Sequence, residues 1–308
     1  MIQQAMQALE TVILDSVASD VKTLHDASRH ILEAGGKRVR PRLMLLSYLA
    51  CGGTEIERVL PAAAAVELVH TASVVHDDIN DHGVIRRGRP SVNALWGRTF
   101  ALLTGDFLFT KVYELMAPYK DLNIVLSEAT VALVEGETLQ ASAVKDNNFS
   151  RQVYYDIIAR KTAALFRSAA HMGGELAGAD KTTVEALRLY GFNVGLAFQI
   201  VDDVLDLTAD TEQLGKTSGI DIQQGRGYAV AYAVNGEAKG GQAAVAEQPS
   251  DPMAAIREKM LAGEAVKEGY AQANMLKQAA VASLDVLSAS PHKDLLIELA
   301  RLVVDRDH

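Results

Sequence analysis

Apolar residues recur at intervals of three and four along almost the whole chain. The segments LPAAAAVELVHTASVVH and LRLYGFNVGLAFQIVDDVLDL show this spacing, which places apolar side chains on one face of an α-helix. Alternation of apolar and polar residues, the pattern of half-buried strands, is scarce. We therefore expect an all-α protein in which long helices pack against one another in a bundle.

The expected helices are separated by glycine-rich segments such as Gly35-Gly36 and Gly52-Gly53. The stretch NGEAKGGQAAVAEQPSDP, residues 235–252, is rich in Gly, Ala and polar residues and is expected to be a flexible loop. Too little chain follows it for a separate core, so we expect one domain over residues 1–308. The periodicity predicts helices over residues 3–33, 41–51, 57–80, 91–117, 121–145, 150–178 and 181–208, and several between 252 and 306.

Composition excludes several classes of protein. A formal net charge of −9 argues against a nucleic-acid partner, which needs a broad basic surface. Cys51 is the one cysteine, so no internal disulfide forms and a reducing compartment is expected. The N-terminal residues do not follow a signal-peptide pattern, and apolar runs break before the roughly 20 residues of a membrane span. We expect a cytoplasmic protein without a transmembrane segment.

Two aspartate clusters of the form DDxxD stand far apart in the sequence, at residues 77–81 and 202–206. On a helix the first and last aspartates share a face, and the middle one lies about 100° round. One such cluster alone is usually a solvated face or a cap. Both clusters, however, lie toward the C-terminal ends of apolar helices, where the helix dipole opposes negative charge. A cation must offset them.

Aspartate oxygens without accompanying cysteines suit hard cations. A sparse set that leaves room for water and phosphate oxygens favours Mg²⁺ over Ca²⁺. Two such helices facing each other would hold several Mg²⁺ ions around a diphosphate. The candidate metal ligands are Asp77, Asp78, Asp81, Asp202, Asp203 and Asp206.

Basic residues accompany both clusters. Arg86 and Arg87 follow the first, Lys161-Thr162 lies in IIARKTAALF, and Lys216 follows the second cluster in LGKTSG. A separate loop, LEAGGKRVRPRL, offers three cations to a second phosphate group, namely Lys37, Arg38 and Arg40. Each cation alone would be an ordinary surface residue near a helix end. Together they indicate two phosphate sites.

These motifs resemble those of the trans-type polyprenyl diphosphate synthases, or polyprenyl synthetases. The resemblance runs from GGKRVRP through HTASVVHDDINDHGVIRRGRPS, LLTGDFLF, EGETLQ, RKTAALF and FQIVDDVLD to GKTSGIDI. It implies the isoprenoid synthase fold, a single large all-α bundle with a central active-site cavity, and a homodimer. After GIDI the chain departs from the family pattern, with Arg226 at a position where relatives commonly carry lysine.

The resemblance also implies residue roles. The six aspartates would hold Mg²⁺ that bridges to an allylic diphosphate, which Arg86, Lys161, Thr162, Gln199 and Lys216 would contact. The diphosphate of isopentenyl diphosphate would be bound by Lys37, Arg40, His70 and Arg87. His70 lies two helical turns before Asp77 and so shares its face. The residues expected to be catalytic are Asp77, Asp78, Asp81, Asp202, Lys161 and Lys216.

The implied activity is Mg²⁺-dependent, head-to-tail condensation of isopentenyl diphosphate with an allylic diphosphate. In relatives, a bulky aromatic four or five positions before the first aspartate stops elongation early. This chain has Ala72 and Ser73 there, so a product of twenty carbons or more is expected. Alternatively, the floor of the product pocket lies on another helix.

Three other functions remain open at this point. A class I terpene cyclase also ionises an allylic diphosphate, but it usually lacks both the second DDxxD and the second phosphate loop. A helical phosphohydrolase built on His-Asp pairs would leave residues 202–206 unexplained. A non-catalytic subunit of a heteromeric synthase would be expected to carry degenerate aspartate clusters, whereas both are intact here.

Overall fold

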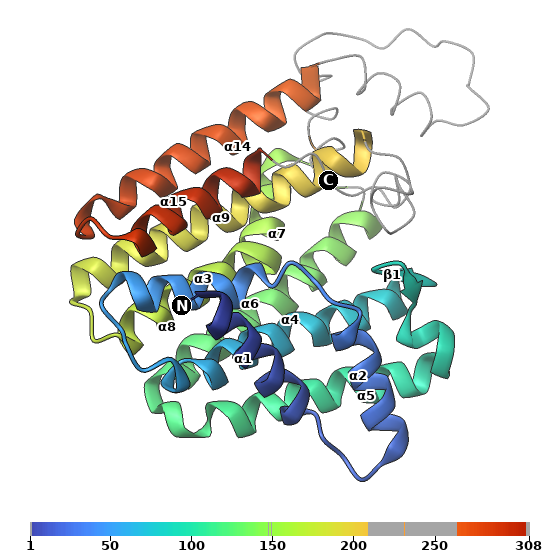
Figure 1. Ribbon diagram of the computed structural model, residues 1–308. Helices are drawn as coiled ribbons and strands as arrows, with labels where there is room; N and C mark the ends of the chain where they lie inside the picture. Colours follow the sequence, from blue (N-terminus) through green and yellow to red (C-terminus); the bar gives the residue numbers. More distant parts are fainter. Residues whose placement is uncertain (1, 147, 149, 209–230, 232–263, 306–308) are drawn as a thin grey trace, which may run out of the picture.

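The computed structural model describes residues 2–146, 148, 150–208, 231 and 264–305 (Figure 1). Within these residues almost every element is a helix, which confirms the all-α prediction. Lys216, Arg226 and the expected loop at 235–252 lie outside the described residues.

The long helices follow the predicted ranges closely after the first 33 residues. They are α1 (Ile2–Ser16), α2 (Lys22–Glu33), α3 (Val39–Ala50), α4 (Leu60–Asn80), α5 (Val92–Met116), α6 (Lys120–Lys145), α7 (Arg151–Ile158), α8 (Ala164–Leu176), α9 (Lys181–Thr208), α14 (Glu264–Ser283) and α15 (Pro291–Val304). Short 3₁₀ turns are η1 (Ile56–Arg58), η2 (Ala117–Tyr119) and η4 (Leu284–Val286), and η3 (Ala159–Ala163) is a π-helical turn. Serine caps begin α5, α7 and α15, because the side chains of Ser91, Ser150 and Ser290 accept backbone N–H groups of the first turn.

Two local predictions were wrong. The single helix expected over 3–33 is two helices, separated at residues 17–21, where Ser19 Oγ accepts the Val21 N–H. The second difference is a small hairpin of β1 (Ile85–Arg86) and β2 (Arg89–Pro90). Its two turn residues, Arg87 and Gly88, both have positive φ angles, 52° and 71°, as a tight type I′ turn requires.

Helix α4 lies at the centre of the bundle and packs against α1, α3 and α5, while α8 packs on α3 and α9 (Figure 1). On the opposite side of α9 lie α14 and α15. The alanines at 62–65 of α4 are all buried, because a helix that is apolar on every side must be enclosed by others. Within the described chain, Ile56–Asn80 has the length and hydropathy of a membrane span, but 78% of that window is buried inside the protein.

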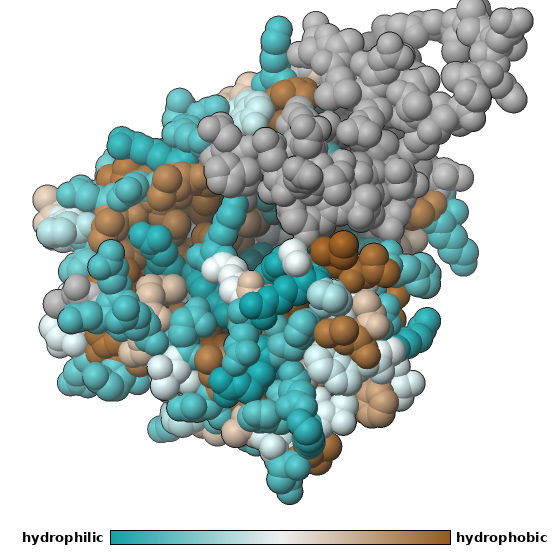
Figure 2. Space-filling view, turned by 45° about the vertical axis from the view of Figure 1, so that its right-hand side comes forward, coloured by the Kyte–Doolittle hydropathy of each residue, from teal (hydrophilic) through white to brown (hydrophobic). Residues whose placement is uncertain are grey.

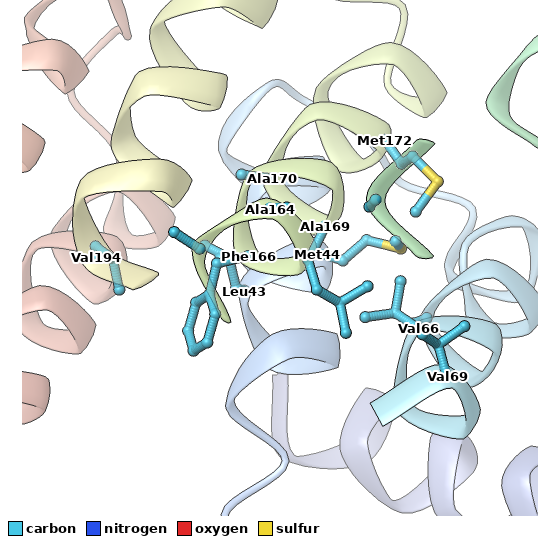
Figure 3. Packing of buried hydrophobic residues seen from close by; sticks show 14 of the residues in the cluster. Leu43, Met44, Val66, Val69, Ala164, Phe166, Ala169, Ala170, Met172 and Val194 are labelled. Carbon is cyan, nitrogen blue, oxygen red and sulfur yellow. The ribbon is translucent and has the colours of Figure 1, made fainter. Parts of the chain in front are cut away.

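The core joins the helices that carry the predicted site residues. Figure 3 shows Leu43 and Met44 of α3 between α8 and the side chains Val66 and Val69 of α4. On the other side of α8, Phe166 lies toward Val194 of α9. This close packing fixes α3, α4, α8 and α9 relative to one another. On the face shown in Figure 2, hydrophobic side chains form small groups among hydrophilic ones.

Candidate active site

The first aspartate cluster lies at the C-terminal end of α4. Asp77 and Asp81 line a cavity of about 330 Å³, as the helical spacing predicts. Asp78 points elsewhere: it is 1% exposed, and its Oδ1 accepts Arg86 Nη2 at 2.6 Å and Nε at 3.0 Å. Burial raises the pKa of Asp78, and the Arg86 guanidinium opposes that rise. Asp78 therefore orients Arg86 through Oδ1 and does not line the cavity, and its role as a metal ligand stays a prediction.

The second cluster reaches the same cavity from α9. Asp202 and Asp203 line it, whereas Asp206 is 1% exposed and does not. Asp206 thus lies outside the cavity lining, and its role as a metal ligand stays a prediction. Asp203 is held in place, since its two oxygens accept the Tyr154 hydroxyl at 2.7 Å and Gln199 Nε2 at 2.8 Å.

A π-helical turn carries two further predicted residues into the cavity. Thr162 donates to Gln199 Oε1 at 2.8 Å, which extends the hydrogen-bond chain from Asp203. Lys161 Nζ lies 3.7 Å from Asp77 Oδ2, and Lys161 and Thr162 both line the cavity. A π-turn holds one residue more than an α-turn and commonly marks functional sites. It joins α7 to α8 here and brings both side chains to the aspartates.

Two residues of α6 complete the surroundings of Lys161 and were missed by the sequence reasoning. Glu137 Oε1 lies 2.7 Å and Gln140 Oε1 lies 2.9 Å from Lys161 Nζ. Burial raises the pKa of Glu137, and Lys161 opposes that rise. Glu137 and Gln140 lie three apart in EGETLQ and so share one helix face, and this spacing could have identified them from the sequence. Helix α6 comes this close through Gly136, where an added Cβ would lie 2.6 Å from Lys161 N.

The carboxylates fit a divalent cation only in combination with a ligand. In the part of the chain that the structure describes, no three Asp, Glu, His or Cys side chains are close enough to chelate one ion. Asp77, Asp81, Asp202 and Asp203 nevertheless face one cavity, and their oxygens are the donors that Mg²⁺ prefers. Such a site suits ions whose remaining ligands are water and the oxygens of a phosphate group.

A second cavity of about 400 Å³ adjoins the first. Arg40, His70 and Phe198 line both cavities, while Lys37 and Arg87 line only the second. The guanidinium of Arg40 lies 4.7 Å from the centre of the Phe166 ring. Two neighbouring arginines of the hairpin therefore line different cavities: Arg86 lines the aspartate cavity and Arg87 lines this one.

Crowded, buried cations give the second cavity its electrostatic character. Burial lowers the pKa of Arg40 to about 10, although Glu67 and Asp202 partly oppose the shift. Burial lowers the pKa of Arg87 as well. His70 has a pKa well below its usual value because of burial and then the neighbouring Arg40 and Arg87, so it is neutral at pH 7. The cavity is suited to a multiply charged anion.

Two predicted residues have other surroundings than expected. Arg38 lines the second cavity, as predicted, but its hydrogen bonds are all within the protein. Arg38 donates to Glu10, Glu67 and the Leu32 carbonyl, so its guanidinium is engaged within the protein rather than available to phosphate. Of the two chain-length candidates, Ser73 lines the aspartate cavity, but Ala72 is fully buried in the core. The apolar part of the cavity wall also comes from α6 and α7, through Ala143, Val144, Val153, Ile157 and Ile158.

Comparisons with known proteins identify the family of the chain. The model of the polyprenyl synthetase family matches residues 21–258. The octaprenyl diphosphate synthase of Escherichia coli K12 is 34% identical, with 99% of this chain and 96% of that protein covered. The geranylgeranyl diphosphate synthase of Methanosarcina mazei is 35% identical, with 92% and 90% covered.

A solved structure gives the same result for the fold. The polyprenyl synthase of Caulobacter crescentus CB15, complexed with calcium and isoprenyl diphosphate, superposes with a TM-score of 0.91 at 35% identity, and 99% of this chain and 96% of that chain are covered. The described helices thus form the isoprenoid synthase fold. On these grounds the chain belongs to the polyprenyl synthetase family and is an enzyme, a prenyltransferase of the prenyl diphosphate synthase type.

Proposed function

We propose that this enzyme condenses isopentenyl diphosphate with an allylic diphosphate, head to tail, and requires Mg²⁺. The observation that carries the proposal is the pair of adjoining cavities, one lined by aspartates from both clusters and the other by cations. Two diphosphate substrates need two such places, and their hydrocarbon ends must meet between them. Arg40, His70 and Phe198, which line both cavities, lie at that boundary.

The allylic substrate binds in the aspartate cavity. Asp77, Asp81 and Asp202 hold the metal ions, and Asp203 supports them through Gln199 and Tyr154. Bound Mg²⁺ supplies positive charge that stabilises the diphosphate as it leaves. Arg86, Lys161 and Thr162 bind the same group, and Lys216 is proposed to join them. Cations positioned in advance stabilise the charge that develops on the leaving oxygen.

Isopentenyl diphosphate binds in the second cavity through Lys37, Arg40, His70 and Arg87. The neutral imidazole of His70 contributes a hydrogen bond rather than a charge. The double bond of this substrate attacks the allylic cation, one carbon–carbon bond forms, and a proton leaves to the departed diphosphate. Apolar residues such as Val74 and Phe198 line the cavity and limit access of water to the cation.

The proposed product has twenty carbons or more. Ser73 lines the aspartate cavity and is small, and the chain has no aromatic residue at position 72 or 73. The named relatives include an octaprenyl and a geranylgeranyl diphosphate synthase, whose products differ in length. A growing chain can therefore pass Ser73 without meeting a bulky side chain.

The deciding experiment incubates the purified enzyme with farnesyl diphosphate, isopentenyl diphosphate and Mg²⁺, followed by chromatographic sizing of the products. Isopentenyl-dependent products of twenty carbons or more are expected, and none with EDTA present. Turnover of the allylic substrate alone to hydrocarbon would indicate a terpene cyclase. No turnover by the isolated chain would favour the non-catalytic subunit. A parallel incubation uses geranyl diphosphate as the allylic substrate, because farnesyl diphosphate already carries fifteen carbons. If that reaction stops at fifteen carbons, the chain-length proposal is wrong.

We further propose a homodimer that forms through α5 and α6. Of the exposed large apolar side chains in the described residues, five lie on α5 and four on α6: Leu95, Phe100, Leu102, Leu103, Tyr113, Ile124, Val131, Val134 and Leu139. Two consecutive helices with this much exposed apolar surface are typical of a protein interface.

The location of the protein is proposed to be cytoplasmic, in keeping with its single thiol, Cys51, whose pKa burial raises to about 11.

A charge placed in this surface is expected to separate the dimer. Val131 is 58% exposed on α6, and the substitution Val131→Asp would bury an unpaired carboxylate between the subunits. Light scattering after gel filtration is expected to give about twice the 33.1 kDa chain mass for the wild type, and the chain mass for the variant. Leu302→Asp is the control, since Leu302 is 53% exposed on α15 and its variant should remain a dimer. A dimeric Val131→Asp protein would contradict the proposed interface.

A further inference from the structure

Arg38 lines the second cavity and joins three separate parts of the chain there. Its Nε donates to Glu10 Oε1 of α1 at 2.8 Å, and its Nη1 donates to Glu67 Oε1 of α4 at 2.7 Å. Its Nη2 donates to the Leu32 carbonyl of α2 at 2.8 Å and to Glu10 Oε2 at 3.2 Å. The side chain is only 4% exposed. All three guanidinium nitrogens are thus bound by the protein itself.

These bonds hold an unfavourable backbone conformation. Arg38 has φ 46° and ψ 38°, the left-handed region, immediately before α3 begins. A residue with a Cβ is disfavoured there, and the charge-assisted bonds to Glu10 and Glu67 offset that cost. The reversal of the chain at Arg38 places its neighbours Lys37 and Val39 against the second cavity, with Arg40 following on the first turn of α3.

Glu67 extends this arrangement to the other cations. It is 2% exposed and lines the second cavity. Burial lowers the pKa of Arg40 and Arg87, and the charge of Glu67 opposes that shift. Against burial, Glu10 and Glu67 together raise the pKa of Arg38. Arg87 in turn donates to the Gly35 carbonyl, and a Cβ on Gly36 would lie 3.0 Å from its guanidinium carbon. One buried carboxylate is therefore the common counter-charge of three arginines that surround the loop.

We propose that Arg38 is a positioning residue for the second diphosphate subsite: clamped by Glu10 and Glu67, it fixes the 35–38 loop so that Lys37, Arg40 and Arg87 converge on one anion. The assignment of that anion to isopentenyl diphosphate rests on the proposed function. The N-terminal helix α1, which contributes Glu10, thereby becomes a structural determinant of this subsite although it does not line it.

The test compares Arg38→Lys, Glu67→Gln and Glu10→Gln with the control Arg29→Lys. Lysine keeps the charge but lacks the planar fork that reaches three partners. Arg29 is a matched control because it pairs with Glu33 on the surface of α2, with 36% of its side chain exposed. Arg38→Lys and Glu67→Gln change buried side chains. Glu10→Gln is included because the Glu10 side chain is 42% exposed, so this variant is expected to fold.

The kinetic readout is the KM of each substrate. Arg38→Lys and Glu67→Gln are expected to raise the KM for isopentenyl diphosphate about tenfold or more, and Glu10→Gln about threefold. The KM for farnesyl diphosphate should stay within about threefold of wild type. A residue that only stabilised the fold would lower Tm and leave both KM values unchanged. Equal rises in the two KM values, or unchanged values in all three variants, would overturn the inference.

A binding readout separates this inference from the proposed function. Calorimetric titration of the wild type with inorganic pyrophosphate in EDTA isolates the cationic subsite, because the aspartate cavity repels the anion without metal. Arg38→Lys should weaken this binding about tenfold. If Arg38→Lys weakens pyrophosphate binding but the wild type forms no product, the proposed function fails and the positioning role stands. If Arg38→Lys binds as tightly as the wild type, the positioning role is wrong.

Discussion

Asp77→Asn and Asp202→Asn are each expected to lower kcat for chain extension by about 10²- to 10³-fold. Each substitution removes one carboxylate from the cavity that residues of both aspartate clusters line. The size of the effect follows from the loss of metal-borne charge stabilisation in an enclosed site. Because the two residues act on one diphosphate, the double variant should be little worse than the more damaged single variant.

The measurement is steady-state incorporation of labelled isopentenyl diphosphate at saturating Mg²⁺, with thermal unfolding to verify the fold. Asp156→Asn is the matched control, since Asp156 is exposed on α7, accepts Gln152 Nε2 and does not line the cavity. Asp78→Asn should lower kcat less than Asp77→Asn does, because Asp78 binds Arg86 instead of facing the cavity. A folded Asp78→Asn enzyme more impaired than Asp77→Asn would contradict the assignment of metal ligands.

Ser73→Phe is expected to shorten the main product by at least one isoprene unit. Ser73 lines the aspartate cavity one turn before Asp77, and its hydroxyl bonds only the His70 carbonyl of its own helix. A phenyl ring at this position would occupy space that the growing chain needs, whereas binding of the diphosphates should be little affected. Product sizing by chromatography measures the effect.

Two companion variants sharpen this test. Ser73→Ala removes the hydroxyl without adding bulk and should leave product length unchanged. Ala72 is fully buried, so Ala72→Phe should instead overpack the core and cost about 1–3 kcal/mol of stability. If Ser73→Phe makes products of wild-type length, the floor of the product pocket lies elsewhere, and the apolar residues of α6 and α7 that line the cavity become the next candidates.

Local spacing predicted much of this molecule because the relevant signals were local. The helices after residue 33 and the shared orientation of Asp77 and Asp81 follow from periodicity. The meeting of Lys161 and Asp77 at one site was implied by the family resemblance instead. The β1–β2 hairpin was missed because two-residue strands have no periodicity to detect.

Other features depend on partners that are remote in sequence. Which aspartates of α9 face the cavity depends on the rotation of that helix against α14 and α8, and of the three predicted there Asp202 and Asp203 line it while Asp206 does not. Arg38 looked like a phosphate ligand because it stands between Lys37 and Arg40 in a basic loop. Only the folded chain brings Glu10 and Glu67 to its guanidinium.

The π-turn η3 makes the number of residues between α7 and α8 as important as their chemistry. Lys161 and Thr162 meet Asp77 and Gln199 only because one additional residue is accommodated at 159–163. Deleting one residue there would restore a regular α-turn and change the direction in which the side chains of the turn point, since successive residues of an α-helix are about 100° apart. The segment therefore tolerates exchange of side chains more readily than a change in length. A homologous helix grafted across the junction of α7 and α8 must keep the same number of residues in it.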